Sequence, residues 1–350
     1  MLKILLLLGG LFSLKTVIDS GEFKKINPHF DGNCSEVYGL EGPEDIIIIN
    51  DSTAIVSADP RRKILSETKT FYAYEQKNSN SNQGSIFLYN LISNELINIT
   101  ENISFEFHPH GISSYRNNEG DLYISAINHT SKGHYVEVFI LKNNQLEPIN
   151  KVTGSLLISP NDIVMISENQ FYITNDHGSK KLTSKMIEDY LQLSRSNLIF
   201  YNGNDFEIII KDLQYANGVN ISDNGEQVYI AETIGKNVSI YNRDKASNKL
   251  HLLKSIDIDS GVDNIEIDID GNLWIGSHPK LFDFVKHAKN PKNLSPSQVI
   301  KISMDDYSIH EIYLNNGKEL SGSSVAAFHK NNLLIGAVFE NKFLHCFLNE

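Results

Sequence analysis

One pattern of polar and apolar residues recurs along the chain. A polar turn is followed by a short run rich in β-branched and aromatic residues, and the run ends in small or polar residues, as strands after tight turns often do. Successive copies are separated by roughly 45 to 68 residues, a span that fits four strands. The six copies cover residues 50–59, 118–128, 168–176, 223–232, 268–277 and 331–339.

Four-stranded units that repeat around an axis form a propeller, and six copies predict six blades. A β-sandwich is the competing all-β fold, but it would not repeat six similar hairpins at a blade-sized spacing. We therefore predict an all-β, six-bladed β-propeller with four-stranded blades and a central tunnel over residues 30–350.

The first 18 residues differ from the rest in composition. Lys3 is followed by a largely apolar run from Ile4 to Leu14 and then by Lys15, which is the form of a signal sequence. The run is shorter than the about 20 apolar residues that a membrane span needs. We predict residues 1–18 to be a signal sequence or, because no clear small-x-small cleavage site follows, a retained anchor. Both interpretations predict the secretory pathway, with the protein secreted or membrane-anchored.

Cysteine and asparagine usage agrees with that compartment. The only two cysteines, Cys34 and Cys346, lie just after the leader and just before the C-terminus. An oxidising compartment favours their pairing, with two buried free thiols as the alternative. Several N-glycosylation sequons suit a secreted glycoprotein, although some lie in predicted strands and Pro296 follows the last of them. The sequons begin at Asn33, Asn50, Asn98, Asn102, Asn128, Asn220, Asn237 and Asn293.

Polar residues also recur upstream of each copy. Counting back about eleven residues from the middle of the repeated strand reaches a polar residue in five copies, and in the second copy His110 lies thirteen residues back. Equivalent positions of a propeller face the same direction relative to its axis. If these residues begin the innermost strands, six blades point polar side chains at one axis. The other members are Glu44, Asn161, Asn217, Asp263 with Asn264, and Ser323 with Ser324.

The chemistry of this ring favours calcium. Its carboxylate and amide members all offer oxygen, and calcium takes six to eight oxygen ligands in flexible geometry. Zinc would favour histidine and cysteine, and magnesium would keep most of its waters. Two carboxylates balance the charge of one Ca²⁺ in a channel that would otherwise bury unpaired charge. We call these oxygen donors the upper set: Glu44, Asn161, Asn217, Asp263 and Asn264.

An aspartate directly follows two of these positions, as Glu44-Asp45 and Asn161-Asp162. Neighbours in an extended chain point opposite ways, so Asp45 and Asp162, the deeper set, are placed to hold a second ion further down the tunnel. The alternative is that each acid caps a turn by accepting hydrogen bonds from backbone amides. Because five sites share nearly the same register, we predict two calcium ions per chain.

Histidines near the ring indicate acid–base chemistry. His110 begins the second blade and His129 ends its repeated strand. A histidine beside a calcium-bound carbonyl can act as general base toward water, with a second histidine orienting it or relaying the proton. The alternative for His129 is a buried hydrogen-bonding role. His177 and His278 also end repeated strands and could line the same mouth, whereas a G-x-S-x-G serine motif is absent from the sequence.

Two further features bear on partners. Apolar residues between Leu182 and Leu193 recur at helical spacing, which predicts a helix packed over one mouth of the tunnel. A lipid- or membrane-facing lid is the alternative for this helix.

The net charge of -12 argues against a nucleic-acid partner, because phosphate binding needs a basic patch.

These motifs, in this order, resemble the paraoxonase/arylesterase family. The resemblance runs from Cys34 to Cys346, nearly the whole chain after the leader. The shared stretches are Pro43-Glu44-Asp45, Pro109-His110-Gly111-Ile112-Ser113, Pro160-Asn161-Asp162-Ile163-Val164, Thr174-Asn175-Asp176-His177, Tyr215-Ala216-Asn217-Gly218, Val262-Asp263-Asn264-Ile265 and Leu334-Ile335-Gly336.

The resemblance implies a propeller that is closed by a Cys34–Cys346 disulfide. It implies a catalytic calcium on the upper set, and a structural calcium on Asp45, Asp162 and the carbonyl oxygen of Ile112. Both ions are therefore expected from the family as well as from the residues.

The resemblance also implies catalytic roles. His110 matches the proposed base of the family, and His129 matches its partner. Members hydrolyse lactones and aryl esters and often keep their leader as a lipid or membrane anchor, so we expect a calcium-dependent hydrolase of such small molecules. Some paraoxonase-like proteins instead act as membrane-anchored chaperones for ion channels, and a gluconolactonase-type propeller with a different metal is a third alternative. The intact histidine pair favours the enzyme.

The chain departs from the family pattern between Pro60 and Ser85. That segment borders the substrate mouth in the family, so the natural substrate stays open. The sequon at Asn128 adjoins His129, and a glycan there would disturb the histidine pair.

Overall fold

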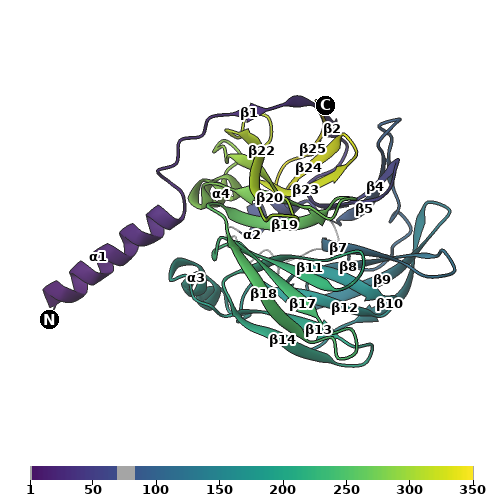
Figure 1. Ribbon diagram of the computed structural model, residues 1–350, viewed down its shortest axis with the longest axis horizontal. Coiled ribbons are helices and arrows are strands. Elements are labelled where there is room, and N and C mark those ends of the chain that lie inside the picture. The colour runs from purple at the N-terminus through teal and green to yellow at the C-terminus, as the bar shows by residue number, and fades with distance from the viewer. Residues whose placement is uncertain (1, 69–82, 350) are drawn as a thin grey trace.

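The computed structural model describes residues 2–68 and 83–349, and it consists of six antiparallel sheets arranged around one axis (Figure 1). Five sheets have four strands and one has five. Radial repetition of such sheets is the propeller architecture. The predicted six-bladed fold is therefore confirmed.

Each of the first three blades is made of four consecutive strands. The strands are β3 (Pro43–Asn50), β4 (Thr53–Ala58), β5 (Ser85–Asn90) and β6 (Leu96–Asn98) in blade 1; β7 (Pro109–Arg116), β8 (Leu122–Thr130), β9 (Gly133–Lys142) and β10 (Gln145–Val152) in blade 2; and β11 (Pro160–Ser167), β12 (Gln170–Asn175), β13 (Ser196–Tyr201) and β14 (Phe206–Leu213) in blade 3.

Blades 4 to 6 continue the pattern, with N-terminal strands added to the last two. The strands are β15 (Ala216–Ile221), β16 (Gln227–Glu232), β17 (Asn237–Arg243) and β18 (Leu250–Asp257) in blade 4; β19 (Gly261–Ile267), β20 (Leu273–His278), β21 (Ser297–Ile302), β22 (Ile309–Asn315) and β1 (His29–Phe30) in blade 5; and β23 (Ser323–His329), β24 (Asn332–Ala337), β25 (Lys342–Leu348) and β2 (Gly32–Tyr38) in blade 6.

The two ends of the chain close the ring together. β2 lies antiparallel to β25 and completes blade 6, so the last blade is built from both termini. Cys34 pairs in register with Cys346, and the two form a disulfide across 312 residues of sequence. The predicted disulfide is confirmed.

The repeated strands of the sequence are the second strands of the six blades. The polar residues upstream of them lie in the first strands, and each first strand contacts the first strands of the two neighbouring blades. The first strands are therefore the innermost ones, as expected. They are β3, β7, β11, β15, β19 and β23.

Apolar side chains fill the spaces between neighbouring blades. Successive residues of an inner strand point to opposite faces of the sheet, and each face is covered by another blade. Ile47 packs with Ile112 of blade 2, whereas Ile46 packs with Val325 of blade 6. This double coverage explains why adjacent apolar residues, rather than an alternating pattern, occupy the inner strands.

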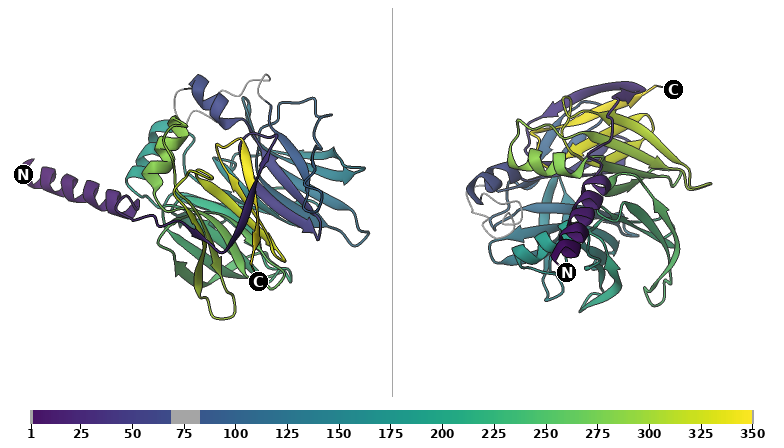
Figure 2. Two further views of the ribbon diagram at one scale, coloured as in Figure 1. Left: turned by 90° about the horizontal axis from the view of Figure 1, so that it is seen from above. Right: turned by 90° about the vertical axis from the view of Figure 1, so that its left-hand side faces the viewer.

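Short helices gather at one end of the propeller (Figure 2). α2 (Arg61–Thr68), α3 (Leu182–Tyr190) and α4 (Leu281–Lys289) each connect the second strand of a blade to the third. Because the second strand is antiparallel to the innermost one, it ends where the innermost strand begins. The helices therefore border the mouth at which the ring residues lie.

α3 confirms the helix predicted from Leu182 but ends at Tyr190 instead of continuing to Leu193. Gln192 takes a positive φ of 52°, a left-handed conformation that commonly terminates helices. α1 (Leu2–Asp19) covers the predicted leader. Across residues 2–68 and 83–349, no helix has the length and apolar character needed to cross a membrane. In the divergent segment 60–85, residues 69–82 lie outside the described residues.

Candidate metal centre and active site

A β-bulge near the start of every innermost strand positions the ring. The register between first and second strands shifts at this place in all six blades. A bulge adds an unpaired residue to one strand and re-aims its side chains. The strict alternation assumed from the sequence therefore does not hold here. The residues inside the shifts are Glu44, His110 with Gly111, Asn161 with Asp162, Asn217 with Gly218, Asp263 with Asn264, and Ser324.

Four oxygens of the upper set have no hydrogen-bond partner among the described residues: Glu44 Oε2, Asn161 Oδ1, Asn217 Oδ1 and Asn264 Oδ1. All four side chains are buried, and each unpaired buried acceptor costs about 1–3 kcal/mol. Two of the three amide nitrogens are engaged, since Asn264 Nδ2 donates to Glu44 Oε1 at 2.9 Å and Asn217 Nδ2 to Thr233 Oγ1 at 3.0 Å. The orphaned oxygens fit the ligand preference of a hard cation such as calcium.

Asp263, the fifth member, is oriented by a hydrogen bond to a buried histidine. Asp263 Oδ2 hydrogen-bonds His278 Nε2 at 2.8 Å, and the His278 ring stacks on Phe284 of α4. Burial raises the pKa of Asp263, while the hydrogen bond from His278 lowers it. No three His, Cys, Asp or Glu side chains cluster as a metal site in the part of the chain that the structure describes. The amide oxygens are therefore essential to this donor set.

The deeper set lies one residue further along two of these strands. Asp45 Oδ2 accepts the Ile112 N–H at 2.8 Å, and Asp162 Oδ2 accepts the Val219 N–H at 2.7 Å. Burial raises the pKa of both carboxyl groups well above the usual range, and a neighbouring carboxylate, Glu44 for Asp45 and Asp45 for Asp162, raises it further. A divalent cation would offset this cost. The N–H of Ile112, rather than its carbonyl, contacts the carboxylate, so the carbonyl ligand stays a prediction.

Two glycines occupy the positions of blades 2 and 4 that correspond to Asp45 and Asp162. A Cβ atom on Gly111 would lie 2.5 Å from Asp162 Oδ1, and one on Gly218 would lie 2.6 Å from the Asp263 carbonyl oxygen. A side chain at either position would collide with the innermost strand of the next blade. The glycines therefore allow the innermost strands to approach closely beside the two aspartates.

His110 and His129 meet beside the upper set. His110 Nε2 lies 3.5 Å from Glu44 Oε1, and His110 Nδ1 lies 2.8 Å from His129 Nε2. His129 is fully buried. Burial, followed by the charges of His134 and His110, lowers the pKa of His129 well below its usual value. The structure brings the predicted pair together, and His129 is also the buried hydrogen-bonding residue of the alternative interpretation.

A third histidine, which the sequence patterns did not single out, extends the pair. His134 Nδ1 lies 2.8 Å from His129 Nδ1. The two residues are directly opposite each other across the β8–β9 hairpin. The signal that could have found His134 is the short polar turn between the two histidines, which predicts a tight hairpin and hence cross-strand neighbours.

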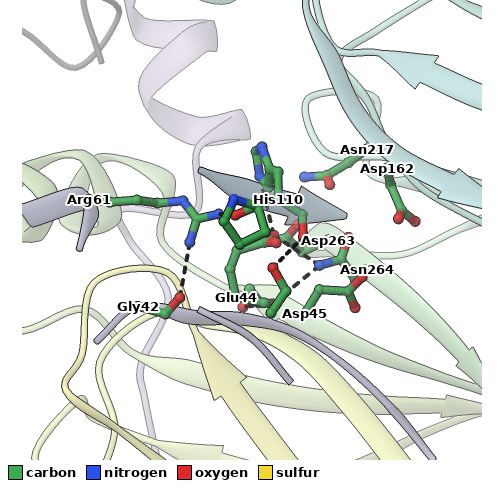
Figure 3. Close-up of polar contacts among 12 residues, drawn as sticks. Gly42, Glu44, Asp45, Arg61, His110, Asp162, Asn217, Asp263 and Asn264 are labelled. Carbon is green, nitrogen blue, oxygen red and sulfur yellow. Dashed lines mark hydrogen bonds and ion pairs between the residues drawn. The ribbon is translucent and has the colours of Figure 1, made fainter. Parts of the chain in front are cut away.

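A pocket opens above the ring. Its floor includes His110 and four members of the upper set, and its walls carry apolar side chains of α2 and α4 such as Leu65, Phe282 and Phe284. The last turn of α1 reaches the rim. Arg61, at the start of the divergent segment, is buried in the wall and donates to the carbonyl oxygens of Gly42 and Pro109 at 3.0 Å (Figure 3).

His177 and His278 both line this pocket. His177 is held between Asp176 Oδ1 at 2.6 Å and Asp189 Oδ1 at 2.9 Å. Burial opposes the charged form, but the two carboxylates outweigh it and raise the pKa of His177 to about 10. The two carboxylates therefore favour the charged form of His177, which ties α3 to the rim through Asp189.

The sequon next to the histidine pair is closed to glycosylation in this structure. Asn128 is fully buried. Its Nδ2 donates to the Glu106 carbonyl oxygen and to Glu137 Oε1, both at 3.0 Å, and its Oδ1 accepts the His108 N–H. A glycan does not fit there, so the concern about the neighbouring His129 falls away.

The fold and the ring define a six-bladed propeller with polar side chains at one end of its axis, and the comparisons identify its family. The arylesterase family model matches residues 70–348. Serum paraoxonase/arylesterase 1 of Mus musculus is 33% identical, covering 93% of this chain and 91% of its own. Serum paraoxonase/lactonase 3 of Oryctolagus cuniculus is 29% identical, covering 94% and 92%. The chain belongs to the paraoxonase/arylesterase family.

A solved structure supports the fold alone. A luciferin-regenerating enzyme superposes with a TM-score of 0.57 at 10% sequence identity, covering 90% of this chain and 95% of that one. For the compartment, relatives named serum paraoxonases and the Cys34–Cys346 disulfide indicate an extracellular or secretory setting.

Proposed function

We propose that this protein is a calcium-dependent hydrolase of lactones and aryl esters. The observation that carries the proposal is that three residues with an orphaned buried oxygen, Glu44, Asn161 and Asn217, meet His110 at the floor of one pocket. Relatives that are named arylesterase and lactonase point to the same reaction class. The upper set would hold one Ca²⁺, and the deeper set with the Ile112 carbonyl a second.

The chain's own residues supply the acid–base chemistry. Bound in the upper set, Ca²⁺ would polarise the carbonyl of the substrate and stabilise the developing oxyanion. His110 Nε2, which faces the floor, accepts the proton of the attacking water. His129 Nε2 accepts the hydrogen bond of His110 Nδ1–H and so keeps the Nε2 lone pair of His110 available. The pocket walls of α2 and α4 give apolar contact to the aryl or acyl part.

A hydrolysis assay with metal control tests this proposal. Phenyl acetate and a simple lactone are offered to the protein before and after chelation, and again after calcium is restored. We expect turnover to be lost on chelation and regained with calcium. Elemental analysis should find two calcium ions per chain. A calcium-loaded protein that hydrolyses none of these substrates would overturn the proposal in favour of the chaperone role.

The predicted lipid or membrane contact also remains a proposal. The C-terminal part of α1 contacts the end of α3, since Thr16 Oγ1 donates to the Tyr190 carbonyl oxygen at 3.4 Å and Lys15 Nζ to Gln192 Oε1 at 2.8 Å. Large apolar side chains on both are exposed, including Ile18 and Ile187. Co-sedimentation with phospholipid vesicles should fall when these two residues become serine.

A further inference from the structure

We propose that His134 is the outer member of a three-histidine relay that carries protons between the pocket floor and solvent. The inference deepens the proposed function and rests on it. It assigns a role to a residue outside the paired histidines, on an element that does not line the pocket.

The contacts form one continuous path. His110 Nε2 faces the floor, His110 Nδ1 meets His129 Nε2 at 2.8 Å, and His129 Nδ1 meets His134 Nδ1 at 2.8 Å. Ring centroids are 5.0 Å and 4.9 Å apart, with interplanar angles of 62° and 90°. The rings therefore meet through their nitrogen atoms and do not stack. Each N···N separation is within hydrogen-bond range.

Exposure changes along the path as a relay requires. The His110 side chain is 16% exposed and lies at the pocket floor. His129 is fully buried, and His134 is partly exposed. Within the described residues, the pocket lining includes His110 but neither of the other two histidines. His134 is therefore exposed to solvent outside the pocket lining, at the far end of the path.

A consistent set of tautomers allows one proton to pass. In the resting state His110 and His129 carry their protons on Nδ1, and His134 carries its proton on Nε2. When water attacks, its proton goes to His110 Nε2, the Nδ1 proton of His110 goes to His129 Nε2, and the Nδ1 proton of His129 goes to His134 Nδ1. His134 Nε2 releases its proton to solvent. One proton enters and one leaves.

The second half of the reaction resets the path. The leaving alkoxide, or the phenoxide of an aryl ester, takes a proton from His110 Nε2. The protons then shift inward along the two histidine–histidine contacts, while His134 Nε2 regains one from solvent. The carboxylic acid product then ionises in water. The depressed pKa of the buried His129 agrees with this role, because a middle member that stayed charged would trap the proton.

The competing role for His134 is to orient His129 without passing a proton. As a hydrogen-bond acceptor it also holds the tautomer of His129, much as a third group orients a catalytic base. Two substitutions separate the roles. His134→Gln keeps an acceptor oxygen near His129 Nδ1 but cannot pass a proton, whereas His134→Ala removes both capacities.

The experiment measures phenyl acetate turnover by the full, calcium-loaded chain in weak buffer and with increasing imidazole. We expect both variants to lose about tenfold in kcat in weak buffer, at the low end of what partners behind a catalytic group contribute. KM should stay unchanged, and added imidazole should restore kcat. The matched control is His310→Ala on β22, whose ring hydrogen-bonds Ser308. This variant should match the parent with and without imidazole.

Several outcomes overturn the relay. His134→Ala with parental kcat in weak buffer does so, and so does His134→Gln with full activity, which leaves a positioning role only. Loss of activity that imidazole does not restore is equally contrary. If both variants misfold, the parent's kcat is measured at increasing fractions of D₂O in the solvent. A linear dependence would mean that a single proton moves in the rate-limiting step, which is contrary to the relay. A parent without activity overturns the proposed function as well, and the parent arm makes that case distinguishable.

Discussion

The upper and deeper sets lie one residue apart on shared strands, yet their oxygens are used differently. In the upper set four oxygens have no partner among residues 2–68 and 83–349. In the deeper set the two carboxylates already accept backbone N–H groups of the next blade, Asp45 from Ile112 and Asp162 from Val219. The upper set thus presents unsatisfied ligands to a pocket, whereas the deeper set links blade 1 to blade 2 and blade 3 to blade 4. We therefore expect the upper set to serve the reaction and the deeper set to serve stability.

The largest effect is expected beside the upper set. His110→Gln keeps size and hydrogen bonding but removes a proton acceptor that titrates near neutral pH. We expect kcat/KM for phenyl acetate to fall about 10²–10⁴-fold, with calcium content and Tm unchanged, because His110 belongs to neither set. His129→Gln should cost less. An active parent whose His110 variant keeps full activity would place the base elsewhere, with Glu44 or Asp176 as the proton acceptor.

The second-largest effect is expected from removing the disulfide that closes the ring, which lies away from both sets. Cys34 and Cys346 join β2 to β25 at the outer side of blade 6. Replacing both by serine should lower the free energy of unfolding by about 4–5 kcal/mol in the chain-entropy model. Urea unfolding without reductant measures this loss. Calcium content and turnover of the folded variant should stay near parental values, and a folded variant that loses either would show that both sets depend on the closure.

Substitutions within the sets test the comparison itself. Asn217→Ala should lower kcat by about 10–100-fold with a small change in Tm. Asp162→Ala should lower Tm with a smaller change in kcat, because a cation bound only by the folded state stabilises it, by about 2.7 kcal/mol at a hundred times its Kd. Thermal unfolding and turnover are measured at several calcium concentrations. Equal losses of both quantities in the two variants would contradict the division.

The smallest effect concerns the rim above the upper set. The pKa of His177 is about 10 when folded, against an ordinary value near 6.5. Because the folded pKa is the higher one, this stabilisation is complete below about pH 6.5 and is lost as pH rises through about 10. Tm should decline across that window more in the parent than in His177→Gln. Parallel declines in the two proteins would show that the pair with Asp176 and Asp189 adds no stability.

Much of this architecture could be predicted because it repeats. Six similar strands at blade-sized spacing, with polar residues at one offset, indicated the propeller and the ring. The disulfide and the helix from Leu182 followed from compartment and periodicity. Three features could not be predicted. The six bulges replace strict alternation, α2 is too polar to show a helical pattern, and His134 is related to His129 only across a hairpin.

By itself, the sequence determined which side chains could meet, because equivalent strands of a closed ring bring equivalent positions to one axis. It did not determine how their atoms are used. Only the tertiary structure decided that Asn217 and Asn264 turn their nitrogens to Thr233 and Glu44 and leave their oxygens unpaired. Only the tertiary structure decided that His129 is buried between two other histidines. The orientation of an amide and the contacts of a histidine ring depend on neighbours from other strands and blades. A local sequence pattern does not specify those neighbours.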